Sequence, residues 1–182
     1  MGFPKALLPF AGETLIARVL RRLEPLTVGR IVVAAPDQDL PALPALIVRD
    51  SEPHRGPVAG LAAGLAAAGA PRAFVTSCDA PFLNRELVRW MIDESASWDV
   101  VAPEWNGRLN PLHAVYATAL AADYRRLLEA DQLRPVDLYP RIRLRVVSPD
   151  EVRRFDPDGR SFTNLNSPED YQRALAAAAE AG

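Results

Sequence analysis

The regular alternation of short aliphatic runs with longer helix-forming segments constrains the fold of this chain most strongly. Strand-length runs occur at residues 30–35, 45–49, 73–78, 99–103 and 142–147. Segments with helix-type apolar spacing or composition occur at residues 13–23, 56–68, 84–95, 119–130 and 168–179. Strands that alternate with helices predict an α/β fold of three layers, α/β/α, around a mainly parallel, Rossmann-like sheet.

Several finer expectations follow from the same pattern. The runs at 30–35 and 45–49 predict buried strands, and the weak alternation at 112–116 predicts a strand paired with a neighbour. Asn166 or Ser167 is expected to cap the last helix. No repeat or linker is visible, and 182 residues are few for two full cores. We therefore expect one domain spanning 1–182.

Charge and composition exclude several classes of partner. The net charge of −2 provides no broad positive field for nucleic acid or an anionic membrane. No apolar run approaches the roughly 20 residues that span a bilayer, and the N-terminus lacks a signal-peptide pattern. The single cysteine fits a reducing compartment. We expect a cytoplasmic protein that binds a small molecule, without a nucleic-acid or membrane partner.

The basic residues contain one conspicuous exception. Of the 21 basic residues, 20 are arginine and only Lys5 is a lysine. Where a compact ammonium is needed, the forked guanidinium of arginine does not substitute. Lys5 is therefore a candidate functional residue, although a GC-rich coding sequence would also produce a lone lysine by chance.

Two aspartates follow directly after predicted strands. Asp50 follows the 45–49 run and Asp79 follows the 73–78 run. Ligands of open α/β sheets bind outside the carboxyl ends of the strands, so both carboxylates are candidates for that edge. Asp79 is on a turn stiffened by Pro81 and is a candidate Mg²⁺ ligand beside substrate phosphates. The structural alternatives are an Asx-turn or helix cap for Asp79 and a cap of the loop 51–55 for Asp50.

Four other features are weaker candidates. The glycines of 56–60 could cradle an anion at a helix start, but close helix packing by Gly60 and Gly64 is the favoured interpretation. Cys78 ends an apolar strand and is expected to be a core residue. His113 lies in an apolar run and is expected to be structural, with its role left open. The arginines between 141 and 154 could meet an anionic substrate, although a solvated strand face is the commoner explanation.

Four motifs in order resemble the molybdenum cofactor guanylyltransferases, the MobA family of the nucleotidyltransferase superfamily. They are MGFPKALLPFAG at 1–12, GPVAG at 56–60, CDAP at 78–81 and NLNSPED at 164–170. The resemblance covers nearly the whole chain. It implies an enzyme that transfers GMP from GTP to the terminal phosphate of molybdenum-molybdopterin, releases pyrophosphate and requires Mg²⁺.

Site roles follow from the resemblance position by position. It implies that Lys5 binds the GTP phosphates, Asp50 the nucleotide, and Asp79 both the nucleotide and Mg²⁺. Asn164 and Asn166 would lie near the pterin or the reacting phosphate. Lys5 and Asp79 are accordingly the expected catalytic residues, with Asp79 as the metal ligand. Molybdoenzymes and other cofactor-biosynthesis proteins are the candidate macromolecular partners.

The sequence departs from the family pattern at two places. The family has an apolar strand and a glycine-rich turn before the Met-Gly pair that is Met1-Gly2 here, so we expect these elements to lie upstream of Met1. Residues 34–36 lack the asparagine that many relatives are thought to place on guanine. Two alternatives stay open: another nucleotidyltransferase, acting with CTP or on a sugar or polyol phosphate, and a non-catalytic pterin-binding protein.

Overall fold

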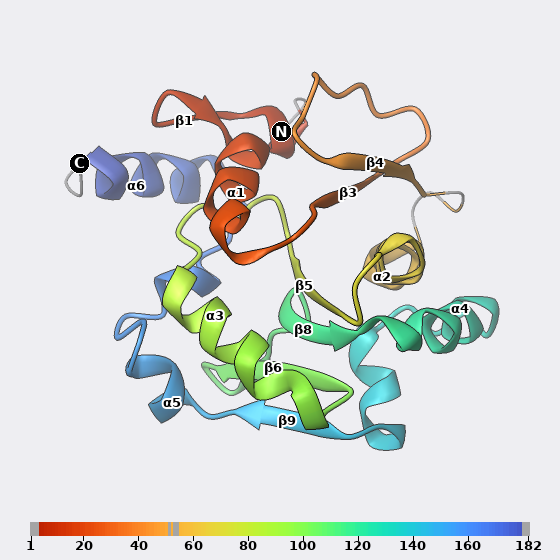
Figure 1. The fold of residues 1–182 in the computed structure, drawn as a ribbon. Coiled ribbons are helices and arrows are strands. Elements are labelled where there is room, and N and C mark those ends of the chain that lie inside the picture. Colours follow the sequence, from red (N-terminus) through yellow and green to blue (C-terminus); the bar gives the residue numbers. More distant parts are fainter. Residues whose placement is uncertain (1–3, 51, 53–54, 180–182) are drawn as a thin grey trace.

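The computed structural model describes residues 4–50, 52 and 55–179, and it has the predicted α/β architecture. The α-helices are α1 Leu15–Leu23, α2 Gly56–Ala67, α3 Arg85–Glu94, α4 Ala121–Glu129, α5 Pro149–Arg153 and α6 Pro168–Ala179. Short 3₁₀ helices are η1 Lys5–Leu7, η2 Glu24–Leu26, η3 Ser95–Ser97, η4 Thr118–Leu120, η5 Pro135–Arg141 and η6 Arg160–Phe162. Figure 1 shows α2 and α4 on one side of the strands and α3 and α5 on the other. None of the helices in this part of the chain is long and apolar enough to cross a bilayer.

The strands form three groups. Their bounds are β1 Pro9–Phe10, β2 Glu13–Thr14, β3 Ile31–Ala34, β4 Leu46–Arg49, β5 Arg72–Thr76, β6 Val100–Trp105, β7 Arg108–Leu109, β8 His113–Ala117 and β9 Leu144–Val147. The largest sheet has the order β5-β8-β6-β7, with β9 pairing β6. In it β5, β6 and β9 share one direction and β8 runs the opposite way. The parallel pair β3–β4 and the hairpin β1–β2 complete the strands of the described residues.

Alternating side chains of the large sheet pack into two layers of core. Val100 and Tyr116 contact α2 and α4 on one face, whereas Val101 and Val115 contact α3 on the other. This division follows from the two-residue period of a strand, which sends successive side chains to opposite faces. The three-layer α/β/α fold is therefore confirmed.

Helix starts follow local capping chemistry. The side chain of Thr14 accepts a hydrogen bond from the Ala17 N–H, so α1 begins two residues later than the predicted segment. Ser167 Oγ accepts from the Asp170 N–H at 3.0 Å, which identifies Ser167 as the cap of α6. Because a cap oxygen satisfies an N–H that has no partner within the helix, each cap fixes a boundary.

The strand predicted at residues 45–49 is present as β4, but the prediction that it is buried is wrong. β4 has an exposed residue at each end, and Leu46 is 57% exposed. β4 pairs only with β3 among the described residues, and α2 covers this pair from one side.

A Cβ on Gly64 would lie 3.1 Å from Val33 Cγ2, so the packing role predicted for Gly64 is confirmed. The same prediction for Gly60 is wrong, because a Cβ there would contact nothing within 4 Å.

Segments from both ends of the described chain share one apolar cluster. Phe10 and Leu15 pack with Leu165 and Ala174, and all four side chains are buried. The hydroxyl of Tyr171 donates a hydrogen bond to the Pro9 carbonyl. Figure 1 shows α6 beside β1 and α1 as a result. This cluster joins the segment that holds Lys5 to the segment that holds Asn164 and Asn166.

Candidate active site

Three of the predicted site residues meet at one place. Lys5 Nζ donates a hydrogen bond to Asn166 Oδ1 at 3.1 Å and lies 3.8 Å from Asp79 Oδ2. The three residues come from η1, from the turn after β5 and from the segment before α6. The cluster therefore has a positive charge, on the ammonium, that can bind phosphate. It also has a negative charge, on the carboxylate, that can bind a metal ion.

The Asp79 carboxylate has the environment of a metal ligand. Its side chain is 14% exposed, and its Oδ1 is buried without a hydrogen-bond partner in the described residues. Asp79 therefore caps no helix or turn with its side chain, which removes the structural alternative considered from sequence. A buried carboxylate oxygen without a donor is costly unless a cation or ligand completes it. Because Mg²⁺ binds through one or two carboxylates plus phosphate oxygens, this donor set fits it.

The turn after Asp79 is held by arginines that sequence reasoning did not identify. Arg18 Nε donates to the Pro81 carbonyl at 3.0 Å, and Arg22 Nε donates to the Leu83 carbonyl at 2.7 Å. Both arginines lie on α1, four residues apart, so they share one face of the helix. They fix the turn from outside while the Asp79 carbonyl accepts from Leu165 N–H. Arg18 and Arg22 therefore hold the backbone of the segment that follows Asp79.

The 164–170 segment is shaped by its own aspartate. Asp170 Oδ2 accepts hydrogen bonds from the N–H groups of Asn166 and Ser167, at 3.2 and 2.9 Å. The hydrogen bond from Arg173, followed by those from Ser167, lowers the pKa of the Asp170 carboxyl. This ionised carboxylate orients the backbone so that the Asn166 side chain reaches Lys5.

Asp50 is placed differently from the other predicted residues. It follows β4 as expected, and its Oδ1 accepts a hydrogen bond from the Glu52 N–H at 2.9 Å. That contact is an Asx-turn at the start of the loop 51–55, which agrees with the capping alternative for this position. No contact joins Asp50 to Lys5 or Asp79 in the described residues, and its role toward a nucleotide stays a prediction.

Comparison with known proteins assigns the chain to a family. A family model described as the MobA-like NTP transferase domain matches residues 1–140. The chain belongs to this family. Among its relatives, the molybdenum cofactor guanylyltransferase of Desulfosudis oleivorans is 32% identical over 177 residues, which cover 97% of this chain and 88% of the relative. This MobA-like chain is accordingly a nucleotidyltransferase.

Solved structures share the fold of the MobA-like chain. Molybdopterin-guanine dinucleotide biosynthesis protein A from Archaeoglobus fulgidus superposes with a TM-score of 0.82 at 24% identity, covering 98% of this chain and 92% of the other. The 2-C-methyl-D-erythritol 4-phosphate cytidylyltransferase from Thermus thermophilus has a TM-score of 0.70 at 21% identity, covering 97% and 94%. Because these two proteins are named for different nucleotides, the shared fold does not select a base.

Two weaker candidates have structural roles in the MobA-like chain. Burial raises the pKa of the Cys78 thiol to about 11, with a smaller effect of Asp79, so the thiol is not a nucleophile at neutral pH. Three arginines of the basic stretch pair with carboxylates: Arg143 with Asp99, Arg145 with Glu151, and Arg153 with Asp150. Their charges are satisfied within the protein, which supports the strand-face interpretation over an anion site.

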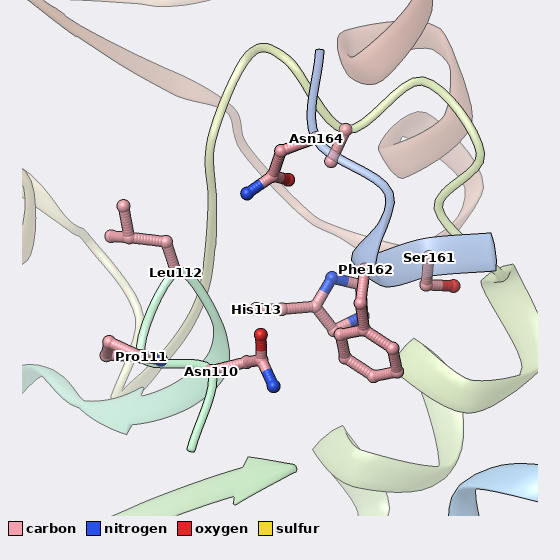
Figure 2. A pocket seen from close by; sticks show the side chains of 8 residues that line it. Asn110, Pro111, Leu112, His113, Ser161, Phe162 and Asn164 are labelled. Atoms are coloured by element: carbon pink, nitrogen blue, oxygen red, sulfur yellow. The ribbon is translucent and has the colours of Figure 1, made fainter. Parts of the chain in front are cut away.

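A cavity of about 180 Å³ lies next to the Lys5–Asp79–Asn166 cluster of the MobA-like chain. Its walls come from the turn after β5, from the loop that leads into β8, and from η6 with the residues after it. Figure 2 shows Asn110, His113 and Asn164 around this cavity, with the Phe162 ring beside the imidazole. Asn164 lines this cavity and does not contact Lys5 or Asp79 in the described residues, so its role toward the acceptor stays a prediction.

His113 should make the stability of the protein depend on pH. Burial lowers its pKa to about 4 from 6.5, against a smaller opposite effect of Asp156. Below pH 6.5 the unfolded chain takes up a proton that the folded chain refuses until about pH 4. The contribution of His113 to the free energy of unfolding is therefore fully present above pH 6.5 and decreases as the pH drops towards 4. At pH 5 the loss is about 2 kcal/mol.

Urea unfolding of the wild type and of His113→Leu at pH 7 and pH 5 measures this difference. Between pH 7 and pH 5 the free energy of unfolding of the wild type should fall by about 2 kcal/mol. That of His113→Leu should fall much less. An equal loss in both proteins would assign the acid sensitivity to other groups.

Proposed function

We propose that this chain is a molybdenum cofactor guanylyltransferase, which transfers GMP from GTP to the terminal phosphate of molybdenum-molybdopterin. The observation that carries the proposal is the meeting of Lys5, Asp79 and Asn166. A triphosphate requires a fixed cation, a metal ligand and neutral polar groups at one point, and the cluster supplies each of them. The named relative from Desulfosudis oleivorans supports the choice of substrates.

The chemistry needs no dedicated base on the protein. The second pKa of a phosphate monoester is near 6, so the acceptor phosphate is largely a dianion at neutral pH and can attack unaided. Its oxygen forms a bond to the α-phosphorus of GTP while the bond from that phosphorus to the bridging oxygen breaks, and pyrophosphate leaves. Lys5 would neutralise charge on the phosphates, and Asn166 would hold the ammonium in place. Mg²⁺ bound at Asp79 would supply Lewis-acid stabilisation of the same charge.

The remaining predicted residues take supporting roles in this proposal. Asp50 would contact the nucleotide from the end of β4, and Asn164 would contact the acceptor from the cavity wall. The two belong to different strand groups, since β4 pairs with β3 and the cavity adjoins β8 of the large sheet. This separation supports one binding region for the nucleotide and another for the acceptor.

A nucleotide panel tests the proposed function. The protein is incubated with molybdenum-molybdopterin, Mg²⁺ and either GTP, CTP or ATP, and pyrophosphate release is measured. GTP should be used at least tenfold faster than the others, because a pocket built for one base edge leaves polar groups unpaired with another. Equal or faster use of CTP would favour the cytidylyl alternative. Pterin binding without turnover of any nucleotide would favour the non-catalytic alternative.

Replacement of Lys5 tests the role of the only lysine. Lys5→Ala should lower the rate of pyrophosphate release about 10²-fold, since loss of one fixed charge or donor typically costs that much. Lys5→Arg should not restore the rate, because the guanidinium is wider and cannot present a point charge between Asn166 and Asp79. Arg143→Ala, at an exposed ion pair with Asp99, is the control and should retain activity. Full activity of Lys5→Arg would contradict a steric requirement for lysine.

A further inference from the structure

The cavity beside the cluster contains an imidazole with no hydrogen-bond partner. His113 is 3% exposed, and both of its ring nitrogens are buried without a partner in the described residues. Leaving a buried polar atom unpaired typically costs about 1–3 kcal/mol, so two on one ring call for an explanation. His113 is at the start of β8, directly opposite Thr76 at the end of β5. Its ring is therefore at the same edge of the sheet as Asp79.

The imidazole offers two different hydrogen-bonding groups. Because burial keeps the pKa of His113 near 4, the ring is neutral at pH 7. A neutral imidazole presents one N–H donor and one acceptor nitrogen. Asn110 lies beside it on the same wall; its Nδ2 donates to the Arg108 carbonyl at 3.0 Å, and its Oδ1 is turned toward the imidazole (Figure 2). The wall thus carries one donor, the imidazole N–H, and two acceptors, the other imidazole nitrogen and Asn110 Oδ1.

Aromatic rings pack around His113, and one of them, Phe162, lines the cavity. The Phe162 ring lies edge-on to the His113 ring at 5.0 Å and stacks on Trp105 at 5.7 Å, and the Phe74 ring lies edge-on to His113 at 5.1 Å. Apolar and aromatic side chains with a few polar groups are typical of sites for small-molecule ligands. A cavity of about 150 Å³ holds a benzene-sized ring, so about 180 Å³ is enough for a ring but not for a whole nucleotide.

We propose that this cavity binds the pterin ring of the acceptor, with His113 and Asn110 hydrogen-bonding its polar edge. This inference rests on the proposed function, in which the acceptor carries a pterin at one end and a phosphate at the other. Ala80 and Asn164 line the cavity, and their near neighbours Asp79 and Asn166 belong to the cluster with Lys5. A ring in the cavity therefore leaves its phosphate tail at the ammonium. His113 and Asn110 become specificity residues for the acceptor.

Variants of the cavity wall test this assignment by steady-state kinetics. His113→Leu and Asn110→Ala are expected to raise the KM for molybdenum-molybdopterin roughly tenfold each, and to leave the KM for GTP unchanged. Arg108→Ala, an exposed neighbour of Asn110 that does not line the cavity, should leave both KM values unchanged. Urea unfolding at pH 7 confirms that each variant is folded. Unchanged acceptor KM in both wall variants overturns the inference, as does a rise in the KM for GTP alone.

A second measurement separates this inference from the proposed function. Free 6-hydroxymethylpterin, which has no phosphate, is titrated into each protein and followed by its own fluorescence. The wild type and Asp79→Asn should bind it alike, and the wall variants should bind at least tenfold more weakly. Loss of pterin binding in the wall variants without any GMP transfer by the wild type would overturn only the proposed function. GMP transfer with wild-type KM in the wall variants would overturn only the cavity assignment, and absence of both transfer and pterin binding would overturn both.

Discussion

Asp79→Asn is expected to lower the rate of GMP transfer by about 10³-fold while leaving the protein at least as stable as the wild type. The substitution removes the negative charge that would bind Mg²⁺ but keeps the size of the side chain. In the described structure the carboxylate contributes only a 3.8 Å contact with Lys5, and its Oδ1 is buried without a partner. A neutral amide removes the desolvation penalty of this charge, so the free energy of unfolding should be unchanged or higher.

Pyrophosphate release over a Mg²⁺ titration and urea unfolding measure the two parts of this prediction. The half-saturating Mg²⁺ concentration should rise along with the loss of rate. Asp99→Asn is a matched control, because it makes the same change in charge at the start of β6, the opposite edge of the sheet, where Asp99 pairs with Arg143. Wild-type turnover in folded Asp79→Asn would remove Asp79 from the catalytic site.

Gly159→Ala should produce the largest loss of stability among single glycine replacements in the described residues. Gly159 has a φ of 63°, which alanine adopts only at a cost of about 1–2 kcal/mol. A Cβ at this position would also overlap the indole of Trp105. The indole cannot move freely, because the Phe162 ring stacks on it and the Arg153 guanidinium lies over its ring. Overpacking adds about 1–3 kcal/mol, so a total of about 3 kcal/mol is expected.

Thermal and urea unfolding of Gly159→Ala measure this loss, with Gly12→Ala as the control. Gly12 has a φ of 86°, but a Cβ there would contact nothing within 4 Å. The control therefore carries the backbone cost without the clash. Gly159→Ala should unfold about 6–12 °C lower than the wild type, and Gly12→Ala should lose less than half of that. Equal losses in the two variants would show that Trp105 yields to the added methyl group.

Local patterns predicted most elements of this fold because their causes are local. The helix predicted at 168–179 begins where the sequence indicated, since Ser167 and Pro168 define its start through a cap oxygen and a fixed φ, and it continues to Ala179, the last described residue. The sequence contains two further local signals, one for a turn and one for a helix start. Asn106 and Gly107, both with positive φ, form the turn between β6 and β7, and Ser148 with Glu151 forms a capping box that begins α5.

The sequence indicated which residues belong to the candidate site better than it indicated which residues contact them. The strand-end position indicated Asp79, and the four motifs indicated Lys5, Asn164 and Asn166. The anchoring of the Asp79 turn by Arg18 was not predictable, because a helix surface arginine 63 residues away carries no local sign of its partner. The partial exposure of β4 was not predictable either, because a short aliphatic run has the same sequence pattern whether one or both of its faces are covered.

Lys5 and Asn166 are 161 residues apart, so the contact between them cannot form until most of the chain has been synthesised. At a synthesis rate of about 5–20 residues per second, Asn166 is added about 8–30 s after Lys5. Until then, Phe10 and Leu15 have no Leu165 or Ala174 to cover them. A nascent chain on the ribosome therefore lacks part of the cover of Phe10 and Leu15, and it lacks Asn166 at the candidate site. We expect translation that stops before the last helix to give a product with this apolar cluster incomplete, which favours aggregation.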